Sequence, residues 1–97
     1  MQVIHARCAG LDVHKKTVVA SVMITALDGT LQQETKTFAT TTADLLALSD
    51  WLRSYGVTHV AMESTGVYWK PVHAILEGHF ELIVGNARHI RNVPGPM

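Results

Sequence analysis

Two acidic residues in this sequence occupy positions suited to metal-assisted chemistry. Asp12 lies near the end of an apolar, strand-like run that begins at residue 3, and Glu63 directly follows a second such run at residues 57–62. Desolvating a lone carboxylate costs free energy unless a partner compensates its charge, and a divalent cation commonly fills that role between two converging carboxylates. The pair therefore predicts a shared metal site, with Asp12 and Glu63 as metal ligands and catalytic residues.

Each acid also has an ordinary structural interpretation. Asp12 precedes His14 and a turn, so it could be a hairpin acid, and Glu63 could favour the N-terminus of a helix that starts near Val67. We favour the metal site for both residues. Among the histidines, His14 is the one close enough to Asp12 in the sequence to belong to the same site.

The cations of the chain gather around these two segments. Eight Lys and Arg residues balance eight Asp and Glu residues, and a formal net charge of zero argues against a general electrostatic binder of nucleic acid. Several cations nevertheless fall in or just after the segments that close around the acids, and we predict that they contact nucleic acid: Lys15, Lys16, Lys70, Arg88 and Arg91. The two adjacent lysines suit an ordinary solvated turn equally well, and the two arginines would share one face of a helical tail.

Ser64 and Thr65 precede the second expected helix and are further candidates for nucleic-acid binding. Their hydroxyls could cap that helix, or the backbone amides there could receive a phosphate group. Capping alone is the more ordinary of these two roles.

The first half of the chain has the pattern of three strands. Residues 3–13 and 17–27 are apolar on both faces, which is typical of central strands, and residues 31–39 alternate weakly, as a solvated edge strand does. Asp28-Gly29 between the second and third runs is a strong hairpin signal. We therefore expect an antiparallel meander.

The second half alternates between helix and strand. A capping pair, Thr41 and Asp44, opens a helix that ends at Gly56, and residues 57–62 form a short buried strand. A second helix runs from near Val67 to near Gly78, and residues 80–84 supply a fifth strand. The order is βββαβαβ.

This order predicts an α/β fold with a mixed sheet and helices packed on its faces. Placing the fourth strand beside and parallel to the first gives the strand order 3-2-1-4-5, which is the ribonuclease H-like (RuvC-like) arrangement. In that order Asp12 and Glu63 become neighbours at one edge of the sheet, where such folds place their ligands.

The composition fits one folded domain spanning residues 1–97. With 47% apolar and 16% charged residues the chain can bury a core, and no apolar run approaches the roughly 18 residues that span a bilayer. We expect a cytoplasmic protein with no membrane partner. The single cysteine, Cys8, and the scattered histidines show no zinc-site spacing.

Four blocks of the sequence resemble the N-terminal RuvC-like domain of DEDD-type insertion-sequence transposases. The resemblance covers essentially the whole chain, and the blocks in order are far more specific together than singly: residues 10–15, 62–69, 84–87 and 92–95. It implies a recombinase that cleaves and transfers DNA strands during transposition with bound Mg²⁺ or Mn²⁺. Asp12 and Glu63 stand where this family has its first and second acids.

The resemblance also implies what this chain lacks. The family's third and fourth acids follow its Pro-Gly turn, whereas here Pro94-Gly95 is followed only by Pro96 and Met97. We therefore expect a domain that is incomplete at its C-terminus, and an enzyme that is active at full length but inactive as this fragment. Some members are directed by an RNA and act as oligomers, so the resemblance raises a guide RNA and a homo-oligomer as partners beside DNA.

Two other functions fit parts of the pattern. An actin-like or sugar-kinase ATP-binding lobe also opens with Gly-x-Asp and a meander, but His14, Lys15 and Lys16 would crowd a triphosphate in the turn. A non-catalytic nucleic-acid-binding or assembly module is the other alternative.

Overall fold

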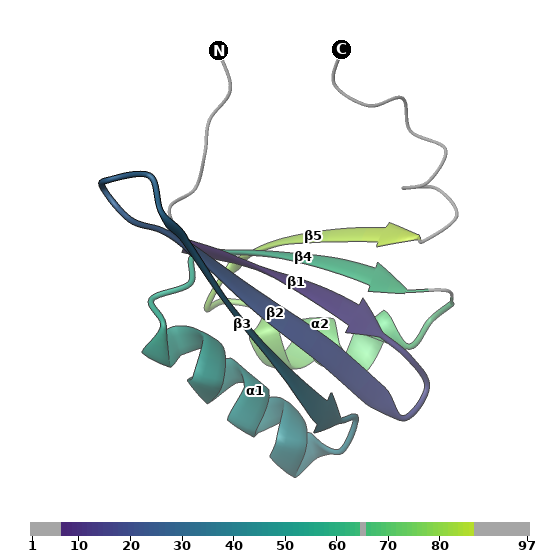
Figure 1. Ribbon diagram of the computed structural model, residues 1–97. Helices are drawn as coiled ribbons and strands as arrows, with labels where there is room; N and C mark the ends of the chain where they lie inside the picture. Colours follow the sequence, from purple (N-terminus) through teal and green to yellow (C-terminus); the bar gives the residue numbers. More distant parts are fainter. Residues whose placement is uncertain (1–6, 65, 87–97) are drawn as a thin grey trace.

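The protein is a five-stranded mixed sheet with two helices (Figure 1). We describe it from a computed structural model, in which residues 7–64 and 66–86 are defined. The elements in chain order are β1 (Arg7–Val13), β2 (Thr17–Thr25), β3 (Leu31–Ala39), α1 (Thr42–Ser54), β4 (His59–Ser64), α2 (Trp69–Leu76) and β5 (Glu81–Asn86). The strands are ordered β3-β2-β1-β4-β5, which confirms the ribonuclease H-like order predicted from the sequence. β1 pairs antiparallel with β2 and parallel with β4, and β5 continues the parallel half.

Both helices cover the same face of the sheet, as Figure 1 shows, rather than one face each. The reason is topological. The chain passes from β1 to the parallel β4 through α1 and from β4 to β5 through α2, and both steps advance in the same direction across the sheet. Since such crossovers are right-handed, two steps in the same direction place both helices on one face.

Alternating side chains separate a buried face from an open one. In β1, Ala9, Leu11 and Val13 are almost fully buried, whereas Gly10 is half-buried and Asp12 is exposed. One apolar cluster joins the buried residues of β1, β2 and β4 to the inner sides of the helices, including Leu48 and Leu52 of α1 and Val72 and Leu76 of α2. Among the defined residues, neither helix has the length and apolar composition that a membrane span requires.

Local hydrogen bonds set the ends of α1. The Thr41 hydroxyl accepts from the Asp44 backbone N–H at 3.2 Å, and the Asp44 carboxylate accepts from the Ala39 N–H at 2.9 Å. At the other end the Arg7 guanidinium donates to the Tyr55 carbonyl at 2.6 Å, and Gly56 adopts a φ of +70°. Thr41, Asp44 and Gly56 are the capping residues and the terminal glycine that the sequence predicted.

β4, α2 and β5 begin later in the chain than the sequence patterns indicated. β4 runs to Ser64 rather than ending at residue 62, so Glu63 lies inside the strand. The first residue of the apolar run is still bonded to α1, since the Val57 N–H donates to the Leu52 carbonyl. Pairing with β1 begins with the bond from the Thr58 N–H to the Arg7 carbonyl. A short turn over residues 66–68 similarly delays α2.

The turn between β1 and β2 is held against the start of α1. The His14 N–H donates to the Thr17 carbonyl at 2.8 Å, which closes the hairpin. The Thr40 hydroxyl donates to the Lys15 carbonyl at 3.0 Å, and the Thr40 N–H donates to the Lys16 carbonyl at 3.1 Å. The backbone of this turn therefore has a fixed position relative to the sheet.

Candidate active site

Asp12 and Glu63 lie directly opposite each other on adjacent parallel strands. The register of β1 and β4 pairs the Cα atoms of Asp12 and Glu63. Their chain neighbours Leu11, Val13 and Met62 are buried beneath the sheet, so both acids project from the open face, which neither helix covers. Asp12 is exposed and Glu63 is half-buried. Two residues far apart in the sequence thus place carboxylates side by side near the carboxyl ends of their strands.

A groove adjoins the two acids on the open face. It has a volume of about 590 Å³ and is lined by Gly10, Leu11, Asp12, Val19, Ser21, Ala61, Met62 and Glu63. The strand register explains its shape, because the row next to the acids places Ser21, Gly10 and Ala61 side by side, and all three are small. A side-chain Cβ added at Gly10 would meet no atom within 4 Å. The groove is therefore open where it meets the acids.

His14 contacts Asp12 directly. The His14 Nε2 atom lies 3.1 Å from the Asp12 Oδ2 atom, and the two side chains are 51% and 59% exposed. The two residues are two apart in an extended segment, which puts their side chains on the same side of the sheet. The histidine singled out in the sequence thus touches the first acid.

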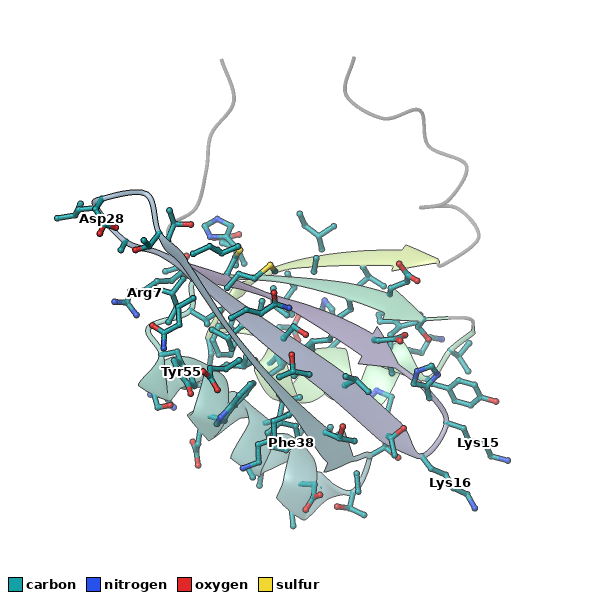
Figure 2. All side chains as sticks on the ribbon, in the orientation of Figure 1. Arg7, Lys15, Lys16, Asp28, Phe38 and Tyr55 are labelled. Atoms are coloured by element: carbon teal, nitrogen blue, oxygen red, sulfur yellow. The ribbon has the colours of Figure 1, made fainter. Side chains whose placement is uncertain are left out.

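The lysines of the β1–β2 turn lie at the same end of the sheet as the acids. Lys15 and Lys16 are exposed, and Figure 2 shows both side chains extending away from the sheet into solvent. Lys70 is exposed in the first turn of α2, which follows β4. These three cations remain available for contact with a polyanion.

Ser64 does not join the acids. Its side chain is 3% exposed, and its hydroxyl donates to the Gly66 carbonyl at 3.3 Å, within its own turn. It lies on the helix-covered face because it follows Glu63 in the strand. Thr65, Arg88 and Arg91, which were also predicted to contact nucleic acid, lie outside the residues that the structure defines.

The small residues that shape the groove were not identified from the sequence. Gly10, Ser21 and Ala61 are unremarkable singly, and their small size matters only because the register of three strands brings them together. The sequence signal that could have indicated the groove is a glycine and a serine at non-core positions of central strands.

The two acids offer hard ligands of the kind that Mg²⁺ prefers. Magnesium binds carboxylate oxygens, keeps several waters and is often held by only one or two protein carboxylates together with substrate phosphates. In the defined part of the chain, no three side chains of His, Cys, Asp and Glu form a group that could hold a metal ion. Asp12 and Glu63 alone thus fit a cation that shares its ligands with water or phosphate.

Comparisons with known proteins agree on the fold. The sequence matches the family model of IS110-type DEDD transposases over residues 9–96. The structure is similar to the fowlpox virus Holliday junction resolvase, with a TM-score of 0.59 and 14% identity over 82% of this chain and 60% of that one. The same resolvase in complex with its substrate Holliday junction DNA gives a TM-score of 0.59 and 15% identity over 94% of this chain and 64% of that one. This chain therefore spans less than two thirds of the resolvase.

A protein of another family shares the architecture. A Ppx/GppA family member from Aquifex aeolicus is similar with a TM-score of 0.52 and 15% identity, over 84% of this chain and 35% of that one. No curated protein sequence matches the chain. At these identities the structural similarities show the fold, and a shared fold does not determine function.

Proposed function

This chain belongs to the family of IS110-type DEDD transposases, and we propose that its Asp12 and Glu63 are two of the metal ligands of a site for DNA strand cleavage and transfer. The observation that supports this role is the pairing of the two acids in register on β1 and β4, beside an open groove. Adjacent carboxylates repel each other unless a cation lies between them. Asp12 and Glu63 lie side by side on the open face, outside the core, and this placement favours metal binding.

In this proposal the acidic residues bind the metal and the small residues make space for DNA. Asp12 and Glu63 hold the cation through carboxylate oxygens at the end of the groove. The small residues Gly10, Ser21 and Ala61 leave room for a sugar-phosphate backbone to approach them. When bound, the cation supplies Lewis-acid stabilisation of the charge that develops on the phosphoryl oxygens.

Exposed cations in the segments that follow β1 and β4 would position the DNA. Lys15 and Lys16 extend from a turn whose backbone Thr40 fixes, and Lys70 lies at the start of α2. Contacts of this kind go to phosphates, so they orient a duplex without reading its sequence. The similar resolvase is described with Holliday junction DNA, which makes branched DNA a suitable probe here. We propose a guide RNA and further copies of the same protein as additional partners.

The 97 residues alone are expected to bind but not to cleave. We propose that they form a single domain whose site needs more acids than the two carboxylates that the defined residues bring together there. Two-metal phosphoryl chemistry requires more ligands than that. DNA cleavage by the purified 97-residue chain, lost on Asp12→Ala, would contradict this expectation.

The metal assignment is tested by Mn²⁺ binding to the 97-residue chain. Isothermal titration calorimetry would compare the natural chain with Asp12→Asn and Glu63→Gln, which keep side-chain size and remove the charge. Glu81→Gln is the matched control, because Glu81 is an exposed carboxylate of β5 at the other end of the same sheet. We expect each site variant to lose at least about tenfold in affinity, with circular dichroism and the control unchanged.

The outcome that overturns the assignment is Mn²⁺ binding by both site variants with undiminished affinity. A thermal-shift assay with ATP or with DNA distinguishes the proposed function from that of an ATP-binding lobe. Stabilisation by ATP with Mg²⁺ and none by a four-way DNA junction would favour the ATP-binding lobe instead.

A further inference from the structure

The contact between His14 and Asp12 lies at a turn that several hydrogen bonds hold in place. His14 directly follows β1, and its backbone N–H closes the hairpin by donating to the Thr17 carbonyl at 2.8 Å. The next two carbonyls of the turn accept from Thr40. The imidazole therefore projects from a backbone that hydrogen bonds hold on both sides, and its Nε2 atom lies 3.1 Å from the Asp12 carboxylate.

The chemistry of the two side chains decides which atom carries the hydrogen at this contact. A carboxylate oxygen can only accept, so the 3.1 Å contact requires a hydrogen on the His14 Nε2 atom. Val19, which faces Asp12 from β2, has an apolar side chain and offers no donor. On its other side Asp12 faces the carboxylate of Glu63, which also cannot donate when ionised. Of these three neighbours, His14 is therefore the one that can donate a hydrogen to Asp12.

The contact is placed where it can contribute little to stability. Both side chains are more than half exposed, and ion pairs or hydrogen bonds between exposed groups are screened by water. Its consequence is conformational. An exposed aspartate otherwise exchanges between rotamers, whereas a partner fixed in space selects one of them and occupies one of its two oxygens.

We propose that His14 is a positioning residue, which holds Asp12 through Oδ2 in one rotamer and directs the Oδ1 atom to the cation. This proposal rests on the proposed function for the identity of the ligand that Oδ1 receives. The positioning itself is a property of the chain without metal. Ligating carboxylates commonly depend on outer hydrogen bonds of this kind for their orientation.

The test compares two substitutions at His14 with a distant histidine. His14→Phe keeps a ring and removes the donor, whereas His14→Gln replaces the ring with an amide that can donate to the same oxygen. His79→Phe is the control, because His79 is exposed and precedes β5 at the opposite end of the sheet. Circular dichroism confirms folding in each case.

The first readout is the χ1 angle of Asp12 in the metal-free 97-residue chain, from three-bond NMR couplings to its Cγ atom. We expect one rotamer to be favoured by a few-fold in the natural chain and in His14→Gln, and the couplings to move toward those of an unbiased mixture of rotamers in His14→Phe. The second readout is Mn²⁺ affinity, which should fall about tenfold in His14→Phe and recover in His14→Gln.

Unchanged couplings of Asp12 in His14→Phe would overturn the proposal, as would Mn²⁺ binding by His14→Phe that is as tight as, or tighter than, in the natural chain. Tighter binding would mean that His14 competes with the cation. Failure of the proposed function has a different signature: Asp12→Asn and Glu63→Gln would then bind Mn²⁺ normally while the couplings still depended on His14.

Discussion

At the residue scale, the absence of a side chain at Gly10 shapes the candidate site. Gly10 lies between Ser21 of β2 and Ala61 of β4, two residues before Asp12 on the same face. Its φ is not in the left-handed region, so backbone conformation does not require glycine here. Glycine weakens a strand, since it costs conformational entropy and packs no side chain. Close approach of a ligand to the backbone best explains a glycine at this position.

A Gly10→Val substitution separates this role from stability. The added Cβ has open space around it, and a β-branched residue suits a strand, so we expect the free energy of unfolding to stay the same or to rise by up to about 1 kcal/mol. Binding of a four-way DNA junction, measured by fluorescence anisotropy, should weaken because the groove is filled. Thr25→Val at the far end of β2 is the control. Full DNA binding by Gly10→Val would show that the groove does not receive DNA.

Asp28 shows a second residue-scale effect, one that depends on pH. Its Oδ1 atom accepts from the Thr30 hydroxyl at 2.6 Å and from the Thr30 N–H at 2.9 Å, in the turn between β2 and β3. These bonds favour the ionised carboxylate, and they lower the pKa of Asp28 below its ordinary value of 3.8, with the side-chain bond as the larger cause. Because the folded pKa is the lower one, the associated stability is present above pH 3.8 and is lost as the pH falls through the folded value.

We therefore expect Thr30→Val to raise the pKa of Asp28 toward its ordinary value. NMR titration of the Asp28 carboxyl carbon measures this directly. The melting temperature should be slightly lower than that of the natural chain at pH 7, and the difference should shrink below pH 3.8. Identical titration curves for the two chains would contradict the assigned cause.

At the scale of elements, boundaries set by local hydrogen bonds were predicted well, and boundaries set by pairing with distant segments were not. α1 begins and ends close to the predicted positions, because Thr41, Asp44 and Gly56 act through bonds within a few residues of each other. The starts of β4 and β5 were predicted too early, since they depend on pairing with distant segments: the Thr58 N–H bonds to Arg7, and the Glu81 N–H bonds to Thr58. No periodicity in the chain encodes such partners.

The capping of α1 gives a prediction at this scale. Thr41→Ala removes the acceptor of the Asp44 N–H, and we expect it to lower the free energy of unfolding by about 1 kcal/mol. Urea denaturation measures the change. Thr42→Ala, at the exposed first residue of the helix, should cost less because that hydroxyl is not the cap. Equal losses in the two variants would show that the cap contributes nothing specific.

At the scale of the whole molecule, the neighbouring position of the two acids was predictable, whereas the groove was not. Strand order follows from counting elements and from the handedness of crossovers, and with it comes the proximity of Asp12 and Glu63. The same rule, applied twice, would also have placed both helices on one face. The groove depends on the exact register of β2, β1 and β4, and a shift of one residue would turn Gly10 and Ala61 to the other face.

Charge is the other property of the whole molecule, and it makes a quantitative prediction. The formal net charge is zero, so any salt-dependent affinity for DNA must come from a few local cations rather than from the overall field.

Each phosphate contact made by a lysine contributes about 0.9 to the slope of log affinity against log salt concentration on B-form DNA. If Lys15 and Lys16 both contact phosphates, replacing both with alanine should reduce that slope by about 1.8. Anisotropy titrations of duplex DNA over a series of salt concentrations measure it, with Arg53→Ala in the last turn of α1 as the control that should leave it unchanged. A slope that is the same in the double variant and the natural chain would mean that the fixed turn carries only solvated lysines, and that DNA approaches the acids by another route.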